Sequence, residues 1–226
     1  MPQISIIIPA RNEEKYIKKT LDSVFASDYK DYEVTVILDS CTDNTQNVIQ
    51  PYKNLNFISI NARKASIARN KGAELAKGSI LVFLDADTII PQNLLSTIHA
   101  QFTPQYSVAT VKAVPDQQKL IPNLMLWSKE LYITLKLRIS SNGIIITNKD
   151  TFQKIKFRED LPFHEDGIFM RQAAKLGKFL YIKSTTVTES MRRYQIMGYI
   201  KPTWFWIKEF WKNIFGKRAK EYPLAR

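Results

Sequence analysis

Cysteine is nearly absent from this sequence of 226 residues, which contains only Cys41. A single cysteine forms no internal disulfide and supplies no cysteine-based zinc site, and it favours a reducing compartment. No uncharged apolar run reaches the roughly 18 residues that a membrane-spanning helix needs, and the apolar run near the N-terminus is too short for a signal peptide. We therefore expect a cytoplasmic protein without a transmembrane helix.

Glycine is also scarce, with seven residues in the whole chain. The sequence contains neither Gly-x-Gly-x-x-Gly nor Gly-x-x-x-x-Gly-Lys-Ser/Thr, the loops with which dinucleotide-binding proteins and P-loop NTPases hold phosphates. Both function classes therefore lose their main support, and no glycine-rich phosphate cradle is available.

The composition is otherwise that of a folded protein with an excess of positive charge. Hydrophobic residues make up 45% of the chain and aromatic residues 12%, which argues against disorder. The 33 basic and 21 acidic residues give a net charge of +12, and nine basic but only two acidic residues follow Met191. A basic surface suits an anionic partner, which leaves nucleic acid, a phosphorylated ligand and a lipid headgroup open.

The first half of the chain alternates short apolar runs with helical patterns. We predict strands at Ile4–Ile8, Val34–Leu38, Phe57–Ile60 and Ile80–Leu84, and helices at Glu13–Ala26, Thr45–Tyr52, Ala65–Ala76 and Pro91–Phe102. This alternation is typical of βαβ units with a parallel sheet, so we expect an α/β fold. The second half is less regular, with strands predicted at 107–114, 143–147 and 179–182 and helices at 124–138, 149–155 and 166–176.

Acidic side chains follow two of these strands, at the sheet edge where ligands bind in such folds. Asp85 and Asp87 come directly after a buried strand, and two carboxylates one residue apart can share Mg²⁺ or Mn²⁺ while leaving positions open for phosphate oxygens. Alone, this pair could equally be a solvated turn or a helix N-cap. Asp39 follows an earlier strand, where a carboxylate can bind a nucleobase or ribose or simply begin a turn.

Four motifs resemble those of the family 2 glycosyltransferases, in the same order. They read SIIIPARNEE, VILDSCTDNT, ARNKGAELAKGSILVFLDADT and HEDGIFMRQAAKLGK, and they span most of the chain, from Ile4 to Tyr181. The resemblance implies a GT-A fold, in which helices flank a Rossmann-like, mostly parallel central sheet. It also implies an enzyme that uses a nucleotide-diphosphate sugar as donor.

The resemblance assigns residues to the donor site. Asp85 and Asp87 would hold the donor and Mg²⁺ or Mn²⁺, with Asp87 as the direct metal ligand. The donor nucleotide would contact Pro9, Ala10, Asn12, Glu13, Asp39, Lys64, Ala65, Arg69, Asp85, Ala86, Arg192 and Arg193. Within this set, Arg69 would lie close to the ribose or phosphates, and Arg192 and Arg193 would bind the diphosphate.

The family's general base is the aspartate of a Glu-Asp pair that begins a late helix. Two such pairs occur here, Glu159–Asp160 and Glu165–Asp166. We choose the second because the family's helix pattern follows it, at Phe169, Arg171 and Gly177, with Gln172 where arginine is usual. The resemblance then implies that Asp166, with Glu165 beside it, removes the acceptor proton in a single displacement that inverts the anomeric centre. The alternative is that Asp166 only caps a helix.

Metal ligation departs from the family pattern in one respect. Many GT-A enzymes have a histidine after the base, whereas His99 and His164 both precede Asp166. Glu189 is a candidate replacement ligand. We expect His99 to be structural, and for His164 a contact with acceptor or product and a plain loop role both stay open.

The chain changes character near Met191, so we predict a catalytic domain at 1–190 and a basic, aromatic helical tail at 191–226. One face of the predicted tail helix presents Trp204, Ile207, Trp211, Ile214 and Phe215. Tryptophan beside lysine suits a helix lying in a membrane surface, which would make the protein peripheral on the cytoplasmic face and its acceptor lipid-linked. A helix packed over the catalytic domain is the equal alternative.

The sequence thus predicts a metal-dependent, inverting glycosyltransferase that acts on an acceptor hydroxyl, such as that of a cell-envelope glycan precursor. A GT-A-like nucleotidyltransferase is the first alternative, but its glycine-rich, arginine-bearing opening loop is absent. The second alternative is a non-enzymatic nucleic-acid-binding module that uses the basic tail. That alternative leaves Asp39, Asp87 and Asp166 without a role, so we expect no nucleic-acid partner.

Overall fold

The computed structural model describes residues 2–117, 119–134, 141–161 and 164–198. Within these ranges the first half of the chain forms β1 (Ile4–Ala10), α1 (Ile17–Phe25), β2 (Tyr32–Asp39), α2 (Thr45–Ile49), β3 (Leu55–Ile60), α3 (Ala65–Leu75), β4 (Ile80–Leu84) and α4 (Leu94–Gln101). The second half forms β5 (Tyr106–Pro115), α5 (Leu120–Thr134), β6 (Ile144–Asn148), α6 (Lys149–Ile155), α7 (Glu165–Ala173), β7 (Lys178–Glu189) and α8 (Arg192–Met197).

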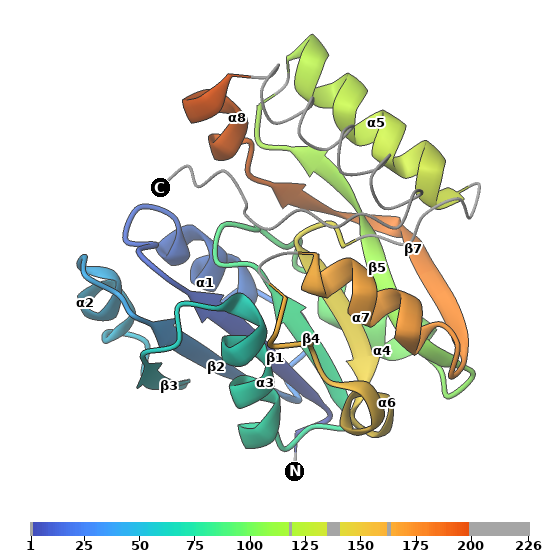
Figure 1. The fold of residues 1–226 in the computed structure, drawn as a ribbon, viewed down its shortest axis with the longest axis horizontal. Coiled ribbons are helices and arrows are strands. Elements are labelled where there is room, and N and C mark those ends of the chain that lie inside the picture. Colours follow the sequence, from blue (N-terminus) through green and yellow to red (C-terminus); the bar gives the residue numbers. More distant parts are fainter. Residues whose placement is uncertain (1, 118, 135–140, 162–163, 199–226) are drawn as a thin grey trace.

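The described strands build one seven-stranded sheet in the order β3-β2-β1-β4-β6-β5-β7 (Figure 1). Four of its six pairings are parallel, and β6 runs antiparallel to both β4 and β5. Helices cover both faces of this sheet. The predicted α/β fold with a mostly parallel central sheet is therefore confirmed.

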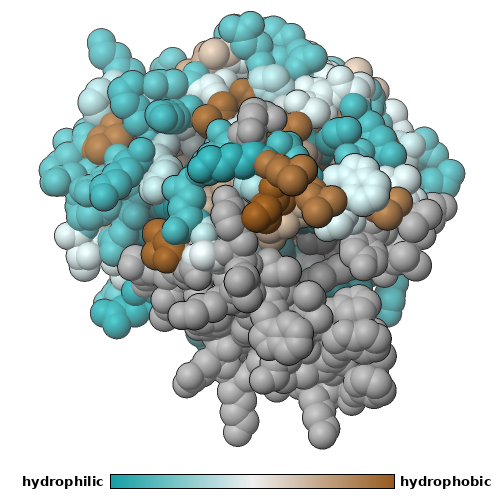
Figure 2. Space-filling model, turned by 90° about the horizontal axis from the view of Figure 1, so that it is seen from above, coloured by the Kyte–Doolittle hydropathy of each residue, from teal (hydrophilic) through white to brown (hydrophobic). Residues whose placement is uncertain are grey.

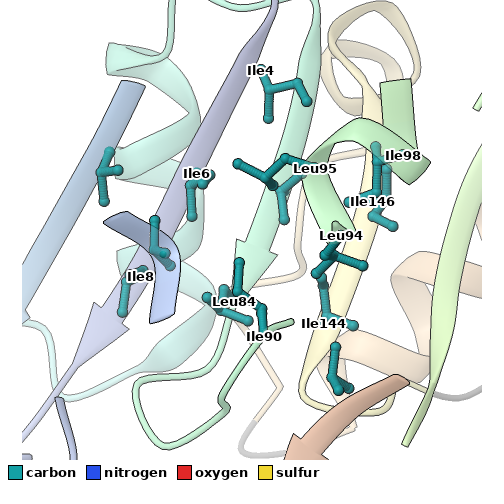
Figure 3. Close-up of a cluster of buried hydrophobic side chains, with 14 of the residues drawn as sticks. Ile4, Ile6, Ile8, Leu84, Ile90, Leu94, Leu95, Ile98, Ile144 and Ile146 are labelled. Carbon is teal, nitrogen blue, oxygen red and sulfur yellow. The ribbon is translucent and has the colours of Figure 1, made fainter. Parts of the chain in front are cut away.

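The central strands are apolar because both of their faces are buried. In β1, Ile4, Ile6 and Ile8 point to one cluster, which α1, α2 and α4 complete, whereas Ile7 points to the opposite cluster below α3, α6 and α7. Figure 3 shows the first cluster, to which β1 contributes Ile4, Ile6 and Ile8 and α4 contributes Leu94, Leu95 and Ile98. Alternation with a period of two therefore distributes one continuous apolar run over two cores.

Several boundaries differ from the sequence-based expectation. Helix α1 begins at Ile17 rather than at Glu13, because Glu13 lies in a turn whose carbonyl accepts hydrogen bonds from the amides of Tyr16 and Ile17. Strand β7 continues to Glu189, far beyond the predicted end at residue 182, and it pairs with β5 across a register shift. The residues after 182 are mostly polar, so apolar periodicity does not predict a strand there, although their backbone pairs with β5.

The predicted tail helix lies in residues 199–226, outside the described residues. Among the helices of the described ranges, none is both long and apolar enough to cross a bilayer.

Candidate active site

The candidate site residues lie where the described strands end at their carboxyl edge. Glu13 follows β1, Asp39 ends β2, and Asp85 and Asp87 follow β4. Glu165 and Asp166 form the first turn of α7, and Arg192 begins α8. Two arginines connect these segments, and each one bridges carboxylates that are far apart in the sequence.

Arg69 is the first bridge. Its guanidinium, almost fully buried on α3, donates from Nη1 to Oε1 of Glu165 over 2.6 Å and from Nη2 to Oδ1 of Asp85 over 3.0 Å. The Phe157 ring lies 5.4 Å from the guanidinium carbon. Burial alone would lower the pKa of Arg69, but the charges of these carboxylates outweigh it and raise that pKa. Arg69 therefore fixes the start of α7 against the loop after β4.

Arg192 is the second bridge. Its Nη1 and Nη2 donate to the two carboxylate oxygens of Glu13 over 2.5 and 2.6 Å, and its Nε lies 2.9 Å from Oδ2 of Asp87. The guanidinium also lies over the ring of Tyr16, 4.5 Å from its centroid. Arg192 thereby holds α8 against the carboxyl ends of β1 and β4.

Asp87 sits in an excess of negative charge. Burial raises the pKa of its carboxyl to about 7; Arg192 opposes this rise, while the charges of Asp85, Glu13 and Glu189 add to it. Two carboxylates one residue apart, such as Asp85 and Asp87, supply the oxygen ligands that a hard divalent cation prefers.

The pKa of Asp166, in contrast, lies below its ordinary value. Burial alone would raise the pKa of Asp166, but the hydrogen bond from Ser141 Oγ (2.5 Å) and the charge of Arg69 outweigh it and lower that pKa. The loop that contains Ser141 is fixed nearby, because the carbonyl of Gly143 accepts from the amide of Asp85 over 2.9 Å. Gly143 has φ +72°, and a Cβ there would lie 2.3 Å from Oγ1 of Thr88, so this turn requires glycine. Because its pKa is lowered, Asp166 is an ionised carboxylate at neutral pH.

Asp39 organises the loop that leads into α3. Its Oδ1 accepts from the amides of Ala62 (2.8 Å) and Arg63 (2.7 Å), and its Oδ2 accepts from the amide of Lys64 (2.7 Å). The hydroxyl of Ser40 donates to Oδ1 as well, over 3.0 Å. With 3% of its surface exposed, the carboxylate is bound by the protein itself. Its direct contact with a nucleobase stays a prediction.

We expect Asp39→Ala to lower the free energy of unfolding by roughly 3 kcal/mol, because it removes the buried acceptor of three backbone amide hydrogen bonds that contribute about 1 kcal/mol each. Chemical denaturation measures this change. Asp28→Ala is the matched control, since the Asp28 carboxylate accepts from the hydroxyl of Ser96 (3.0 Å) on the exposed surface. Equal destabilisation by the two variants would contradict the assigned role of Asp39.

The remaining predicted donor residues surround the same edge. Pro9 and Ala10 end β1, and Asn12, at φ +56°, accepts from the amide of Thr42 over 2.8 Å. This contact joins the loops after β1 and β2, so that the first two predicted motifs form one surface.

Lys64 and Ala65 lie at the N-terminus of α3, where the Lys64 ammonium donates to the carbonyl of Glu159 over 2.7 Å. Ala86 is buried between Asp85 and Asp87, and its carbonyl accepts from the hydroxyl of Thr20 over 2.8 Å. The side chain of Arg193 lies outside what the structure describes.

The candidate ligand Glu189 ends β7 and pairs with Lys129 over 3.1 Å. In the described ranges, no three histidine, cysteine, aspartate or glutamate side chains form a group that could hold a metal ion. His99 packs its ring against Tyr29, whose hydroxyl lies 3.3 Å from Nδ1, as a structural histidine would. His164 precedes α7 in a left-handed conformation, at φ +63°.

Three residues of the site were not predicted from the sequence. Ser141 binds the predicted base, Tyr16 lies below Arg192, and Lys129 neutralises Glu189. Each of them is distant in sequence from its partner and lies outside the four motifs. Only the folded arrangement identifies them.

Comparison with known proteins finds sequence relatives over most of the chain. The sequence profile described as Glycosyl transferase family 2 matches residues 5–160. The poly(ribitol-phosphate) beta-N-acetylglucosaminyltransferase TarS of Staphylococcus aureus is 27% identical over 190 residues, which cover 76% of this chain and 32% of TarS. The GalNAc(5)-diNAcBac-PP-undecaprenol beta-1,3-glucosyltransferase of Campylobacter jejuni is 28% identical over 113 residues, 47% of this chain and 37% of that enzyme. This chain thus spans about a third of the length of either relative.

Solved structures agree on the fold. The mannosyltransferase PcManGT of Pyrobaculum calidifontis, in complex with GDP-Man and Mn²⁺, superimposes with a TM-score of 0.71 at 18% identity, over 98% of this chain and 66% of that one. TarS residues 1–349 in complex with UDP-GlcNAc superimpose with a TM-score of 0.70 at 22% identity, over 91% of this chain and 64% of that one. Because its sequence profile matches more than half of the chain, the protein belongs to glycosyl transferase family 2.

Proposed function

We propose that this protein transfers a sugar from a nucleotide-diphosphate sugar to an acceptor hydroxyl, by a single displacement that inverts the anomeric configuration. The observation that supports this most directly is the arginine bridge from Asp85, in the loop after β4, to Glu165, the neighbour of Asp166. It brings Asp85, which the sequence predicts at the donor site, close to the ionised carboxylate of Asp166. That pair of features is what a displacement at a sugar diphosphate requires.

Asp166 acts as the general base in this proposal. The Ser141 hydroxyl and the charge of Arg69 keep its pKa low, so it can accept a proton at neutral pH. It takes the acceptor proton while that oxygen forms the new bond to the anomeric carbon. The bond to the diphosphate breaks at the same time, and the diphosphate leaves with the electron pair.

The residues present fit a divalent cation. Asp85 binds Arg69 through Oδ1 and its side chain is 42% exposed. Burial, with added repulsion from three nearby carboxylates, raises the pKa of Asp87, and a cation would relieve that repulsion. Asp85 and Asp87 would hold Mg²⁺ or Mn²⁺, and phosphate oxygens and water would fill the other ligand positions. When bound, the cation would supply positive charge that stabilises the departing diphosphate.

Arg192 would gain a further partner when the donor binds. Without donor it neutralises Glu13 and Asp87. Because its Nε already lies 2.9 Å from Asp87, which would hold the cation, the Arg192 guanidinium would also be placed to pair with the diphosphate. This agrees with the donor role that the sequence predicts for Arg192.

The relatives support a sugar-nucleotide donor and suggest an acceptor class. TarS was solved with UDP-GlcNAc and PcManGT with GDP-Man and Mn²⁺. The Campylobacter enzyme is named for an undecaprenol-diphosphate-linked acceptor, and TarS for poly(ribitol-phosphate). We propose a cell-envelope glycan precursor, linked to a lipid, as the acceptor, and a location at the cytoplasmic face of the membrane.

Thermal-shift measurements with UDP, GDP, dTDP and their sugars, with and without Mn²⁺, test the donor assignment. We expect one nucleotide to raise the melting temperature, and only when Mn²⁺ is present, because the cation would join its diphosphate to Asp85 and Asp87. A ligand at about 100 times its Kd stabilises the folded protein by about 2.7 kcal/mol, which such a measurement detects. Identification of transferred sugar by mass spectrometry then establishes the reaction. No shift with any of these ligands would reject the proposed function.

A further inference from the structure

Helix α5 exposes an apolar stripe to solvent. Leu120, Leu124, Trp127 and Leu131 are 84%, 58%, 59% and 42% exposed. Their spacing of four, three and four residues places them on one face of the helix. Large apolar side chains that cluster on a surface in this way usually mark a binding site.

The stripe is not needed to hold α5 on the protein. Leu126 and Ile133, on the other side of the helix, are buried, and α5 packs against β5 through that side. The helix is therefore apolar on two faces, and only one of them faces the core. The face of Leu124, Trp127 and Leu131 is the outward one.

The apolar surface extends beyond α5. Ile196 on α8 is 64% exposed, and Ile121 in the first turn of α5 is 50% exposed. Helices α5 and α8 lie at the same end of the molecule, at the top of Figure 1. Seen from above, hydrophobic side chains gather near the middle of this face (Figure 2). We call the exposed apolar residues of α5 and Ile196 the α5 surface.

Helix α5 borders the candidate active site with the face opposite the stripe. Lys129, in the middle of α5, pairs with Glu189 over 3.1 Å, and the helical period places it on the side of Leu126 and Ile133. Glu189 is close enough to Asp87 to raise the pKa of its carboxyl. A surface that contacts the stripe would therefore be separated from the candidate active site by helix α5 alone.

The charges around the stripe suit an anionic partner. Glu130, the single acidic residue in the sequence of α5, is half-buried in an ion pair with Lys112 over 3.2 Å. Lysines lie at both ends of the helix: Lys119 precedes it and is exposed, and Lys183 donates to the hydroxyl of Thr134 over 3.0 Å. The whole chain has a net charge of +12.

We propose that the α5 surface docks on an anionic bilayer, and thereby presents the active site to an acceptor hydroxyl held at the membrane. The proposal rests on the lipid-linked acceptor of the proposed function. Leucine and tryptophan enter the acyl boundary while lysines at the helix ends contact headgroup phosphates. A second copy of the chain or its own residues 199–226 would also cover an apolar face, but the lysines at both ends of α5 favour an anionic surface.

Vesicle flotation of the full chain tests the proposal. We compare vesicles of phosphatidylcholine alone with vesicles that contain about 30% phosphatidylglycerol. The full chain should float with the anionic vesicles. The double variant Leu124→Gln/Trp127→Gln should bind at least about tenfold less, because it removes the centre of the apolar contact. Binding by the variant that equals the parent's, or no binding by the parent, overturns the proposal.

A matched control separates this contact from general hydrophobicity. Leu75 and Leu176 are 43% and 50% exposed on other parts of the described surface. The double variant Leu75→Gln/Leu176→Gln should bind vesicles as the parent does. Both double variants change only exposed side chains, and an unchanged melting temperature verifies that they fold.

Fluorescence distinguishes α5 from the tail. Three of the four tryptophans lie in the tail, at Trp204, Trp206 and Trp211. With these three changed to phenylalanine, Trp127 is the only emitter, and brominated lipids should quench it. Vesicle binding without quenching assigns the contact to another segment and overturns the proposal. Loss of self-association in Leu124→Gln/Trp127→Gln, without any vesicle binding by the parent, would identify a second copy as the occupant instead.

These measurements use no sugar donor, so they are independent of the test of the proposed function. A null result in the nucleotide screen together with Trp127 quenching would reject the transferase assignment and retain the membrane surface. A nucleotide-dependent thermal shift without vesicle binding or Trp127 quenching would retain the transferase assignment and reject the membrane surface.

Discussion

Asp166→Asn should lower kcat for sugar transfer by about a thousandfold, since a positioned general base contributes about 10² to 10⁴ in rate. Asparagine keeps the shape of the side chain and can still accept the hydrogen bond from Ser141 Oγ. It cannot take a proton from the acceptor at neutral pH. Nucleotide binding should be unchanged, because neither Asp85 nor Asp87 is altered. Steady-state transfer assays and nucleotide titrations of the same preparation measure the two effects.

The other Glu-Asp pair of the chain, Glu159–Asp160, provides a matched control. Asp160 is exposed and accepts from Nε of Arg158 over 2.9 Å, in the loop before α7. Asp160→Asn should therefore transfer sugar at nearly the parental rate. If Asp166→Asn is as active as Asp160→Asn, Asp166 is not the base, and it serves only the N-terminus of α7.

The strands that could be predicted best from the sequence are those that are buried on both faces. Strands β1 and β4 read as continuous apolar runs because their residues alternate between two cores, and both were predicted within two residues at either end. The order of carboxylates after these strands could be predicted for the same reason, since parallel strands end at one edge. Strand β7 was predicted too short, because the polar residues 183–186 interrupt its apolar pattern although the strand pairs with β5 as far as Glu189.

The partners of the carboxylates could not be predicted in the same way. Sequence reasoning placed Arg69 and Arg192 close to donor phosphates, and in the structure they bind protein carboxylates on three other segments. Such ion pairs depend on the distance between loops, which periodicity does not contain. The outward direction of the α5 stripe is a similar case. A helix with two apolar faces has no signal in sequence that says which one meets the core.

Asp87→Asn should abolish nearly all transfer and at the same time make the protein more stable above neutral pH. Loss of a cation-binding carboxylate removes several kcal/mol of charge stabilisation, so we expect a fall in kcat of about a thousandfold. The stability gain follows from the raised pKa of Asp87, about 7 against an ordinary value of 3.8. Burial and the neighbouring carboxylates disfavour the charged form, and asparagine has no charge.

The sign of the pH effect follows from proton binding. Between about pH 4 and pH 7 the folded protein holds a proton on Asp87 that the unfolded chain has released, so the free energy of unfolding falls as pH rises through this window. The free energy of unfolding of Asp87→Asn does not fall in this way, because asparagine does not titrate. Its melting temperature should exceed the parent's at about pH 8, and the difference should disappear near pH 4. Asp31→Asn, which changes an exposed carboxylate before β2, should show no such difference. A parent that is more stable than Asp87→Asn at pH 8 would mean that Arg192 neutralises Asp87 fully, and that the carboxylates have no unmet need for a cation.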